Sequence, residues 1–238
     1  MNIIAIGGGE KTPALRYALE LSGEQQPHVL LVPSSCSTEE AFARKTQLAK
    51  KTFDALGAST SLLHVRGEAP SATRIAHELG HAGIIYTIGG NSPHMLRTMR
   101  EHGTDLAVAT AIKNNTVHAG TSAGALLPFE IGQVNPAKKH DQEEWDFAYL
   151  PMLGVIPGVV GVHADKHDMT LRGMRPDSRM DALIATYPKE ADNKGYAIEE
   201  GAALIIHGDS RFALRSHDAA NVYELERQPS GTITSQIM

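Results

Sequence analysis

A single serine lies between two glycines in the segment Gly-Thr-Ser-Ala-Gly that ends at Gly124. A serine hydroxyl is a weak nucleophile until a base takes its proton and hydrogen-bond donors stabilise the oxyanion that forms on the substrate. The segment follows a short strand-like run and precedes an apolar, helix-compatible run, which is the setting that the G-x-S-x-G motif requires. Gly120 and Gly124 permit a crowded backbone, and the helix N-terminus offers free N–H groups, including that of Ala123. The pattern predicts a nucleophile at Ser122, with a purely structural tight turn as the alternative.

A second glycine-rich turn, Gly89-Gly90-Asn91, also joins a strand-like run to a helix-like run. In a parallel sheet both turns would lie at the C-terminal ends of strands, where ligand sites cluster. The N–H of Gly90 is therefore a candidate for a second oxyanion donor, and the alternative is a helix cap made by Asn91 or Ser92. A third turn, 7–9, has three glycines but lacks a full phosphate-binding motif.

The base that such a serine needs is most often a histidine, and the chain has twelve. His163 ends an apolar strand-like run and follows the serine in the order that α/β hydrolases use. We therefore predict His163 as the general base. Two alternatives are an ordinary histidine at a strand end and a metal ligand together with Asp165 and His167, although that cluster is short.

The elements that must position these residues alternate regularly through the first half of the chain. Strand-like apolar runs are separated by longer helix-compatible stretches that begin with capping residues. We expect strands over 2–6, 28–32, 60–65, 83–87 and 116–119 and helices over 12–23, 38–56, 70–81, 92–102 and 104–114. This rhythm predicts an α/β fold with a mostly parallel central sheet and helices on both faces, a three-layer α/β/α sandwich.

The second half follows a different pattern. Residues 132–151 are polar and bounded by prolines, which favours a long loop that serves a site. Residues 154–164 resemble a strand with a break, and a basic helix-like stretch follows to about residue 185. The segment 195–227 alternates short apolar runs with Gly, Asp and Asn, which is typical of antiparallel strands. We see no internal repeat and expect one domain over 1–238.

Composition excludes several classes of protein. The formal net charge is −5 and the pI is about 6.2, so nothing draws the chain toward nucleic acid or an anionic membrane. The one cysteine, Cys36, rules out an internal disulfide, and the apolar start over 1–6 is too short for a secretory signal. No apolar run reaches the length that spans a bilayer. We expect a cytoplasmic protein, either a monomer or a homodimer, with no nucleic-acid or membrane partner.

Three segments together, 84–96, 117–130 and 153–180, resemble the family of serine peptidases that contains dipeptidase E and cyanophycinase. The most specific features are the Ser-Ala-Gly-Ala run and the Gly-Gly-Asn turn at this separation. The resemblance covers most of the chain and implies a fold related to class I glutamine amidotransferases. It also implies Ser122 as nucleophile, His163 as base, and the N–H groups of Gly90 and Ala123 as the oxyanion hole.

The resemblance further implies a triad acid and a substrate with a carboxylate near the bond that is cut. Acids in this family usually fall between the serine and the histidine, which leaves Asp141, Glu130, Glu143 and Glu144 as candidates. Asp141 is the first choice by its distance in sequence from His163. The guanidinium groups of Arg172, Arg175 and Arg179 are candidates to bind the substrate carboxylate, together with Asn91.

These observations predict a serine peptidase that cleaves an amide bond in a small, aspartate-containing peptide, without a cofactor or a metal ion. An amidase or esterase on the same site is one alternative. Another is a non-catalytic relative that binds an acidic peptide or metabolite, which a carboxylate bonded to His163 would disfavour. Glutaminase chemistry by cysteine is disfavoured because the turn carries Ser122 and Cys36 lies far from it in sequence.

Overall fold

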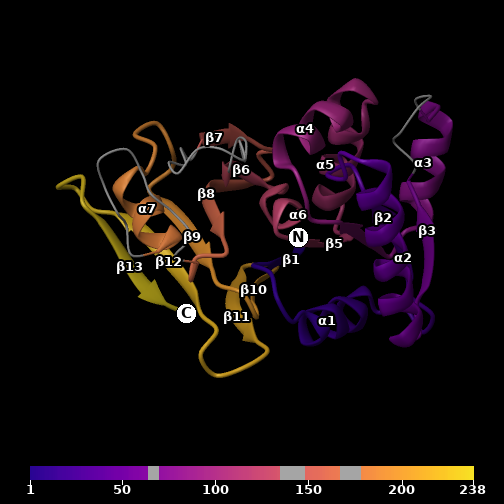
Figure 1. The fold of residues 1–238 in the computed structure, drawn as a ribbon, viewed down its shortest axis with the longest axis horizontal. Helices are drawn as coiled ribbons and strands as arrows, with labels where there is room; N and C mark the ends of the chain where they lie inside the picture. The colour runs from indigo at the N-terminus through magenta and orange to yellow at the C-terminus, as the bar shows by residue number, and fades with distance from the viewer. Residues whose placement is uncertain (64–69, 135–147, 167–177) are drawn as a thin grey trace.

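The computed structural model describes residues 1–63, 70–134, 148–166 and 178–238. Within these residues the chain forms two β-sheets that lie next to one another, with most helices gathered around the first (Figure 1). The first sheet has seven strands in the order β11-β10-β1-β5-β4-β2-β3, and the second has six in the order β13-β12-β9-β8-β6-β7.

The first sheet contains the parallel core that the sequence predicts. Five of its strands are parallel and follow the predicted runs closely: β1 Asn2–Ile6, β2 His28–Val32, β3 Ser59–Leu62, β4 Ile84–Thr87 and β5 Val117–Thr121. Two later strands complete it in the antiparallel sense: β10 Ala202–His207 and β11 Ser210–Arg215. The C-terminal ends of β1, β5 and β4 therefore lie side by side at one edge.

Helices cover both faces of this sheet. On one face lie α1 Thr12–Ser22 and α2 Glu39–Ala55, which pack on alternate strand residues such as Ile4 and Ile6. On the other face lie α3 Ala72–His81, α4 Ser92–Glu101 and α5 Thr104–Lys113, which share a core with Ile3 and Ala5. The period of two along β1 thus divides its side chains between two cores. The predicted three-layer α/β/α arrangement is confirmed.

The starts of three of these helices are fixed by side-chain caps. Thr38, Ser71 and Asn91 each accept a hydrogen bond from the backbone N–H three residues later. Such a cap satisfies one of the N–H groups that a helix leaves free in its first turn. These local signals explain why the helix starts could be placed from the sequence.

The second sheet was not distinguished from the first in the sequence. Its strands are β6 Phe129–Val134, β7 Ala148–Pro151, β8 Ile156–Val162, β9 Lys194–Ile198, β12 Val222–Arg227 and β13 Ile233–Ile237. β6, β8 and β9 are parallel to one another, and β7, β12 and β13 are antiparallel additions. The helix α7 Arg179–Ala185 packs on β8.

The predicted loop over 132–151 is wrong at both ends, because β6 and β7 pair there. Polar residues such as Gln133 occur in these strands, and the side chain of Gln133 is buried. The middle of this segment, 135–147, lies outside the described residues. The antiparallel finish predicted for 195–227 is confirmed for β10, β11 and β12.

One hydrophobic cluster crosses from the first sheet to the second. It joins Ile3 and Leu30 to Phe129, Val160 and Ile198. The short helix α6 Ala123–Leu126 packs against strands of both sheets. A shared core of this kind is what the prediction of a single domain requires, and that prediction stays a prediction.

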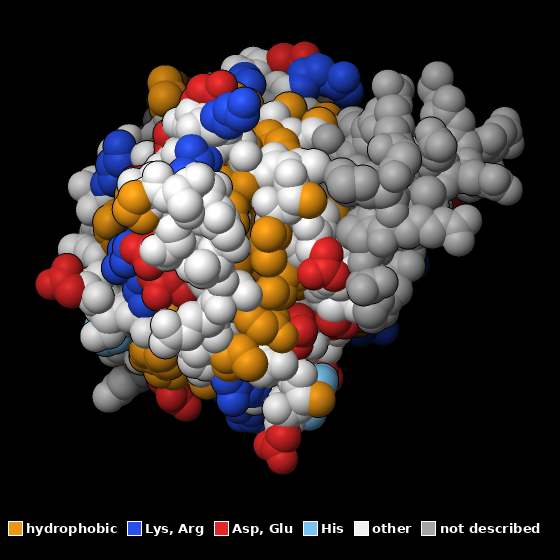
Figure 2. Space-filling view, turned by 90° about the vertical axis from the view of Figure 1, so that its left-hand side faces the viewer, with side chains coloured by type: hydrophobic (Ala, Val, Ile, Leu, Met, Phe, Trp, Pro, Cys, Tyr) orange, Lys and Arg blue, Asp and Glu red, His pale blue; other side chains and the backbone are white. Residues whose placement is uncertain are grey.

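Figure 2 views the molecule from the side of β13 and α7. Hydrophobic side chains form a band on this face, with charged side chains around it. A third hydrophobic cluster lies in this part of the second sheet and includes Val159, Leu183 and Leu225. Among the described residues, no helix has both the length and the apolar character needed to cross a bilayer.

Candidate active site

Ser122 occupies the turn between β5 and α6 in a strained backbone conformation. Its φ is 55° and its ψ is −119°, values that residues with a side chain rarely adopt. The turn is held because the Ser122 N–H donates to the carbonyl of Ile6 at 2.9 Å and the Ser122 carbonyl accepts from the N–H of Ala125 at 2.8 Å. Strain of this kind costs about 1–3 kcal/mol and is often found at functional sites. The predicted strand-to-helix turn at Ser122 is confirmed.

The two glycines of the motif bring α6 unusually close to the sheet. A Cβ on Gly124 would lie 2.1 Å from the carbonyl oxygen of Thr87, and one on Gly120 would lie 2.2 Å from the carbonyl oxygen of Gly124. Contacts this short do not occur between real atoms. Glycine at these two positions is therefore what allows Ser122 to stand at the edge of the sheet.

His163 meets Ser122 from the second sheet. It follows β8 directly, with a φ of 56°, and its Nε2 lies 2.9 Å from the Ser122 Oγ. A neutral imidazole with its proton on Nδ1 accepts the hydroxyl hydrogen at Nε2, which is the arrangement that a general base needs. The structure thus brings together the two residues that the sequence pointed to most strongly.

The other ring nitrogen of His163 bonds to a residue that the sequence analysis did not name. The Nδ1 atom donates to the Glu200 Oε1 at 2.9 Å. Glu200 is the second residue after β9, which is the parallel neighbour of β8. The N–H of Glu200 donates to Asp165 Oδ1 at 2.9 Å, which ties the two strand ends together.

Lys166 is a second partner of the same carboxylate oxygen. Its Nζ lies 3.0 Å from Glu200 Oε1, so this oxygen accepts from both the imidazole and the ammonium. Burial raises the pKa of Glu200, but hydrogen bonds and charge from Lys166 and His163 outweigh burial and hold that pKa below its usual value. Glu200 is therefore ionised at neutral pH.

The pKa of His163 is also lowered from its ordinary value. Burial is the largest cause because it penalises the charged imidazolium, and the positive charge of Arg179 adds to it. The carboxylate of Glu200 acts in the opposite direction. The net result keeps His163 neutral, and able to accept a proton, at neutral pH.

The turn after β4 lies beside Ser122, as the sequence predicted. A Cβ on Gly89 would approach the Ser122 Cβ to 3.0 Å. No hydrogen bond within the described part of the chain uses the N–H of Gly90 or that of Ala123. Both donors are therefore available to a ligand, which is the condition that the two predicted oxyanion donors must meet.

A pocket of about 330 Å³ opens onto the serine and the histidine. Residues 8–9 and 89–90 of the two glycine turns line it, together with residues of α2. Lys11, Arg44 and Lys45 contribute positive charge to this lining, and no acidic side chain of the described residues lines it. The pocket is therefore suited to a small ligand with negative charge.

The third glycine turn serves the histidine. A Cβ on Gly8, whose φ is 146°, would lie 2.6 Å from the Cε1 of His163. The Gly8 carbonyl also accepts from the N–H of Gly201, next to Glu200. The backbone of this turn thus lies close to the imidazole of His163 and to the residue after Glu200. This close approach explains the glycine at position 8, with no need for a phosphate-binding role.

The remaining predicted residues have varied positions. Asn91 caps α4 by accepting from the His94 N–H at 2.9 Å, as its alternative interpretation held. Arg179 begins α7 and is close enough to His163 to lower its pKa. The Glu130 carboxylate accepts from the Gly158 N–H at 3.0 Å. Asp141, Glu143, Glu144, Arg172 and Arg175 lie outside the described residues.

The geometry gives no support to the alternative that His163, Asp165 and His167 bind a metal ion. Asp165 is engaged with the Glu200 N–H, and His163 with Ser122 and Glu200. Over the described ranges, His, Cys, Asp and Glu side chains nowhere gather in groups of three or more that would hold a metal ion. His167 lies outside those ranges.

An α/β fold in which a serine on a strand-to-helix turn contacts a histidine, and the histidine a carboxylate, is that of a serine hydrolase. The sequence matches Peptidase family S51 over residues 3–214. The chain belongs to this family, and it is a serine-type peptidase.

Relatives agree with this assignment. The chain is 28% identical over 234 residues to "Uncharacterized peptidase YgaJ" of Bacillus subtilis, covering 94% of this chain and 91% of that protein. A crystal structure of a peptidase from an acI-B1 actinobacterium superimposes with a TM-score of 0.72 at 19% identity, covering 100% of this chain and 93% of the other. A candidate peptidase E protein from Listeria monocytogenes superimposes with a TM-score of 0.61 at 20% identity, covering 90% and 98%. The two structures support the α/β fold of this chain.

Proposed function

We propose that this serine peptidase cleaves an amide bond in a small, aspartate-containing peptide through a triad of Ser122, His163 and Glu200. The observation that carries the proposal is the unbroken path of two hydrogen bonds, each 2.9 Å long, from the serine oxygen to the Glu200 carboxylate. Glu200 takes the role for which the sequence analysis favoured Asp141.

In the proposed cycle, His163 Nε2 takes the proton of Ser122 as the serine oxygen attacks the substrate carbonyl. The tetrahedral oxyanion accepts hydrogen bonds from the N–H groups of Gly90 and Ala123. The imidazolium, stabilised by Glu200, returns its proton to the leaving amine, and an acyl-enzyme remains on Ser122. Water deprotonated by His163 then releases the acid product.

The positive lining of the pocket supports the choice of an acidic substrate. Lys11 and Arg44 face the same pocket as Ser122, and Arg179 lies near His163. A substrate carboxylate gains charge-assisted hydrogen bonds there that a neutral substrate lacks.

The alternative of a non-catalytic binding protein loses its main support. That alternative depended on the lack of an acid at His163, and Glu200 lies there at 2.9 Å. An amidase or esterase would use the same three residues, so it must be distinguished by substrate.

The first experiment is the reaction of the purified protein with a fluorophosphonate, followed by intact mass. We expect one adduct, located on Ser122 by peptide mapping, and none in Ser122→Ala or His163→Ala. A folded wild-type protein that stays unlabelled would contradict the proposed nucleophile.

The second experiment tests the substrate with matched pairs. Asp-Leu and Asn-Leu dipeptides differ by one charge at nearly constant shape, and we expect the aspartyl peptide to be cleaved at least about tenfold faster, since a desolvated charge-assisted hydrogen bond contributes about 1.5–3 kcal/mol. Equal rates would remove the acidic specificity, and faster turnover of Asp methyl esters with no peptide cleavage would favour an esterase.

A further inference from the structure

Lys45 makes an unusual contact for a lysine on a surface helix. It projects from α2, and its Nζ donates to the backbone carbonyl of Gly89 at 2.6 Å. Its side chain lines the pocket that contains Ser122, and the residue is only partly exposed. By contrast, Lys50 on the same helix makes an ordinary surface ion pair with Asp54 four residues along. Lys45 therefore joins α2 to the turn after β4.

The carbonyl of Gly89 belongs to the same peptide unit as the N–H of Gly90. A trans peptide is planar, so its C=O and N–H point in opposite directions, and the described residues contain no cis peptide. A cation on the carbonyl oxygen fixes the direction of the N–H on the far side of the unit. It also draws electron density from the amide, which strengthens the N–H as a donor.

Two other polar groups of this turn are held by Ser35. The Ser35 Oγ donates to the Ile88 carbonyl at 2.5 Å, and the Asn91 N–H donates to the Ser35 carbonyl at 2.9 Å. A Cβ on Gly90 would lie 2.5 Å from the same Ser35 carbonyl oxygen, so the turn is tightly seated. Lys45 adds an attachment at the Gly89–Gly90 peptide, which lies between those two anchors.

We infer that Lys45 is a positioning residue for the oxyanion hole: its ammonium group holds and polarises the Gly89–Gly90 peptide so that the Gly90 N–H stabilises the tetrahedral intermediate. The inference rests on the proposed function, because it requires Ser122 to attack a carbonyl or phosphonyl centre beside that N–H. Lys45 itself contacts neither the serine nor the substrate in this role.

The experiment measures fluorophosphonate labelling of Ser122 by intact mass over a range of reagent concentrations, which separates kinact from KI. The phosphonyl oxygen occupies the oxyanion hole as the adduct forms, whereas KI reports binding before that step. Complete loss of an oxyanion donor costs about 10²–10³-fold. For Lys45→Met, which leaves the donor in place but unfixed, we expect kinact to fall about 5- to 50-fold and KI to stay within about twofold.

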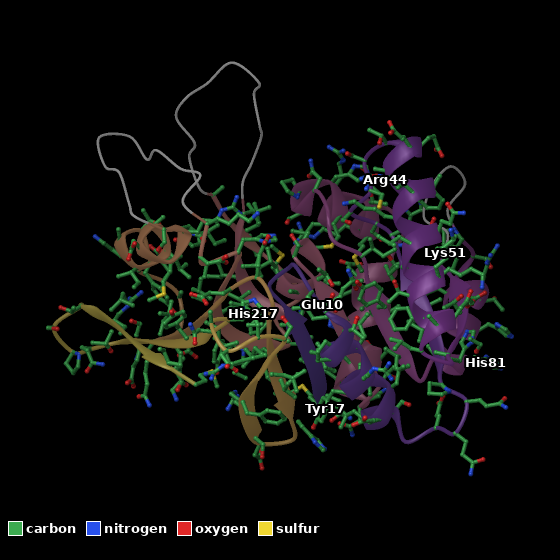
Figure 3. The ribbon with its side chains drawn as sticks, turned by 60° about the horizontal axis from the view of Figure 1, so that its bottom comes forward. Glu10, Tyr17, Arg44, Lys51, His81 and His217 are labelled. Atoms are coloured by element: carbon green, nitrogen blue, oxygen red, sulfur yellow. The ribbon has the colours of Figure 1, made fainter. Side chains whose placement is uncertain are left out.

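Two variants provide controls. Lys45→Arg keeps a cationic donor and should recover most of the lost rate. Lys51→Met removes a charge from the exposed part of α2, outside the pocket, and should label like the wild type (Figure 3). Lys45→Gln is a second neutral replacement, and the melting temperature of each variant establishes that it is folded.

The outcomes separate the inference from the proposed function. If the wild type labels on Ser122 and Lys45→Met labels as fast, the inference is overturned while the nucleophile stands. A raised KI with unchanged kinact would place Lys45 in substrate binding and overturn it too, as would equal losses in the Met and Arg variants, which indicate lost packing. If the wild type does not label, both the proposed function and the inference fail.

Discussion

The candidate site has two halves, one from each sheet, and they contribute different kinds of chemical group. The half from the first sheet contains the proposed nucleophile, Ser122, and the proposed oxyanion donors, the N–H groups of Gly90 and Ala123. The half from the second sheet supplies side chains, His163 and Glu200, from the ends of two parallel strands. The first half depends on the backbone geometry of its turns. The second depends on the protonation of His163 and Glu200. A substitution should therefore affect geometry in one half and pH dependence in the other.

In each half a lysine bonds to a group of the site, and one residue has a strained backbone with a positive φ. Lys45 bonds the Gly89 carbonyl in the first half, and Lys166 bonds the Glu200 carboxylate in the second. Ser122 and His163 both have positive φ values, of 55° and 56°. The same two features thus occur in both halves. They restrict the movement of Ser122 and His163, whose Oγ and Nε2 atoms lie 2.9 Å apart.

The largest effect is expected in the second half, from Glu200→Gln. An amide does not stabilise the imidazolium, and it can favour the wrong tautomer of His163, so kcat should fall about 10³–10⁴-fold with the fold intact. The matched control is Glu199→Gln, because Glu199 bonds Asn221 and Tyr223 rather than His163. Steady-state kinetics on the best peptide substrate measures both, and near-wild-type activity of Glu200→Gln would remove Glu200 from the triad.

In the first half, Gly124→Ala should act through packing rather than protonation. The new Cβ would lie 2.1 Å from the Thr87 carbonyl oxygen, so α6 must shift, at a cost of about 2–4 kcal/mol in the free energy of unfolding. Gly80→Ala is the control, because a Cβ in that helical position has nothing within 4 Å and should stabilise α3 by about 0.5–1 kcal/mol. Urea denaturation compares them. Equal stabilities would contradict the role given to the close approach.

A buried histidine of the first sheet, outside the catalytic contacts, provides a contrast with His163. His118, in β5, is fully buried, its Nε2 bonds the Thr87 hydroxyl, and burial lowers its pKa to about 3. The unfolded chain, with an ordinary histidine pKa near 6.5, binds the proton first. Stability should therefore fall as the pH drops below 6.5, by up to about 1.4 kcal/mol per pH unit from this residue, until both states are protonated near pH 3.

The difference between wild type and His118→Gln isolates this contribution. Urea denaturation between pH 7 and pH 5 should show a steeper loss of stability in the wild type than in the variant. Parallel pH dependences would mean that His118 is not held neutral by the sheet.

The smallest effect is expected from Lys166→Met. The ammonium is partly exposed, so its removal should lower kcat only severalfold. Its positive charge helps to lower the pKa of His163, so without it that pKa rises. Because the neutral imidazole is the active form, the acid limb of the kcat/KM profile should move to higher pH. Lys194→Met, which breaks a surface pair with Glu224, is the control, and an unmoved limb in Lys166→Met would contradict the coupling.

The sequence predicted the first half of the site better than the second. Ser122 and the Gly89-Gly90 turn were found because their signals are local: a strand, a glycine turn and a helix follow one another within about twenty residues. The five parallel strands and the helices around them ended close to their predicted limits for the same reason.

Glu200 was missed because its link to His163 is not local. The search for the acid was limited to the residues between Ser122 and His163, and Glu200 lies 37 positions after the histidine. One signal was present: an apolar strand is followed by Glu-Glu-Gly, as the strand before it along the chain is followed by His163. Using it requires the knowledge that β8 and β9 are parallel neighbours, which depends on strand pairing across the chain.

The division into two sheets was missed on similar grounds. The pattern of a strand does not state which sheet it joins, and β10 returns to β1 after β9 has paired with β8. Register across such distances is decided by packing rather than by local propensity.

The order of the three residues along the chain has a consequence for biosynthesis. Ser122 emerges from the ribosome before His163, and Glu200 follows only after another 37 residues. The first five parallel strands can form while the chain is still being made, but they hold a serine without a base. We therefore expect hydrolytic activity to appear only when β8 and β9 have paired in the second sheet and have brought His163 and Glu200 to Ser122.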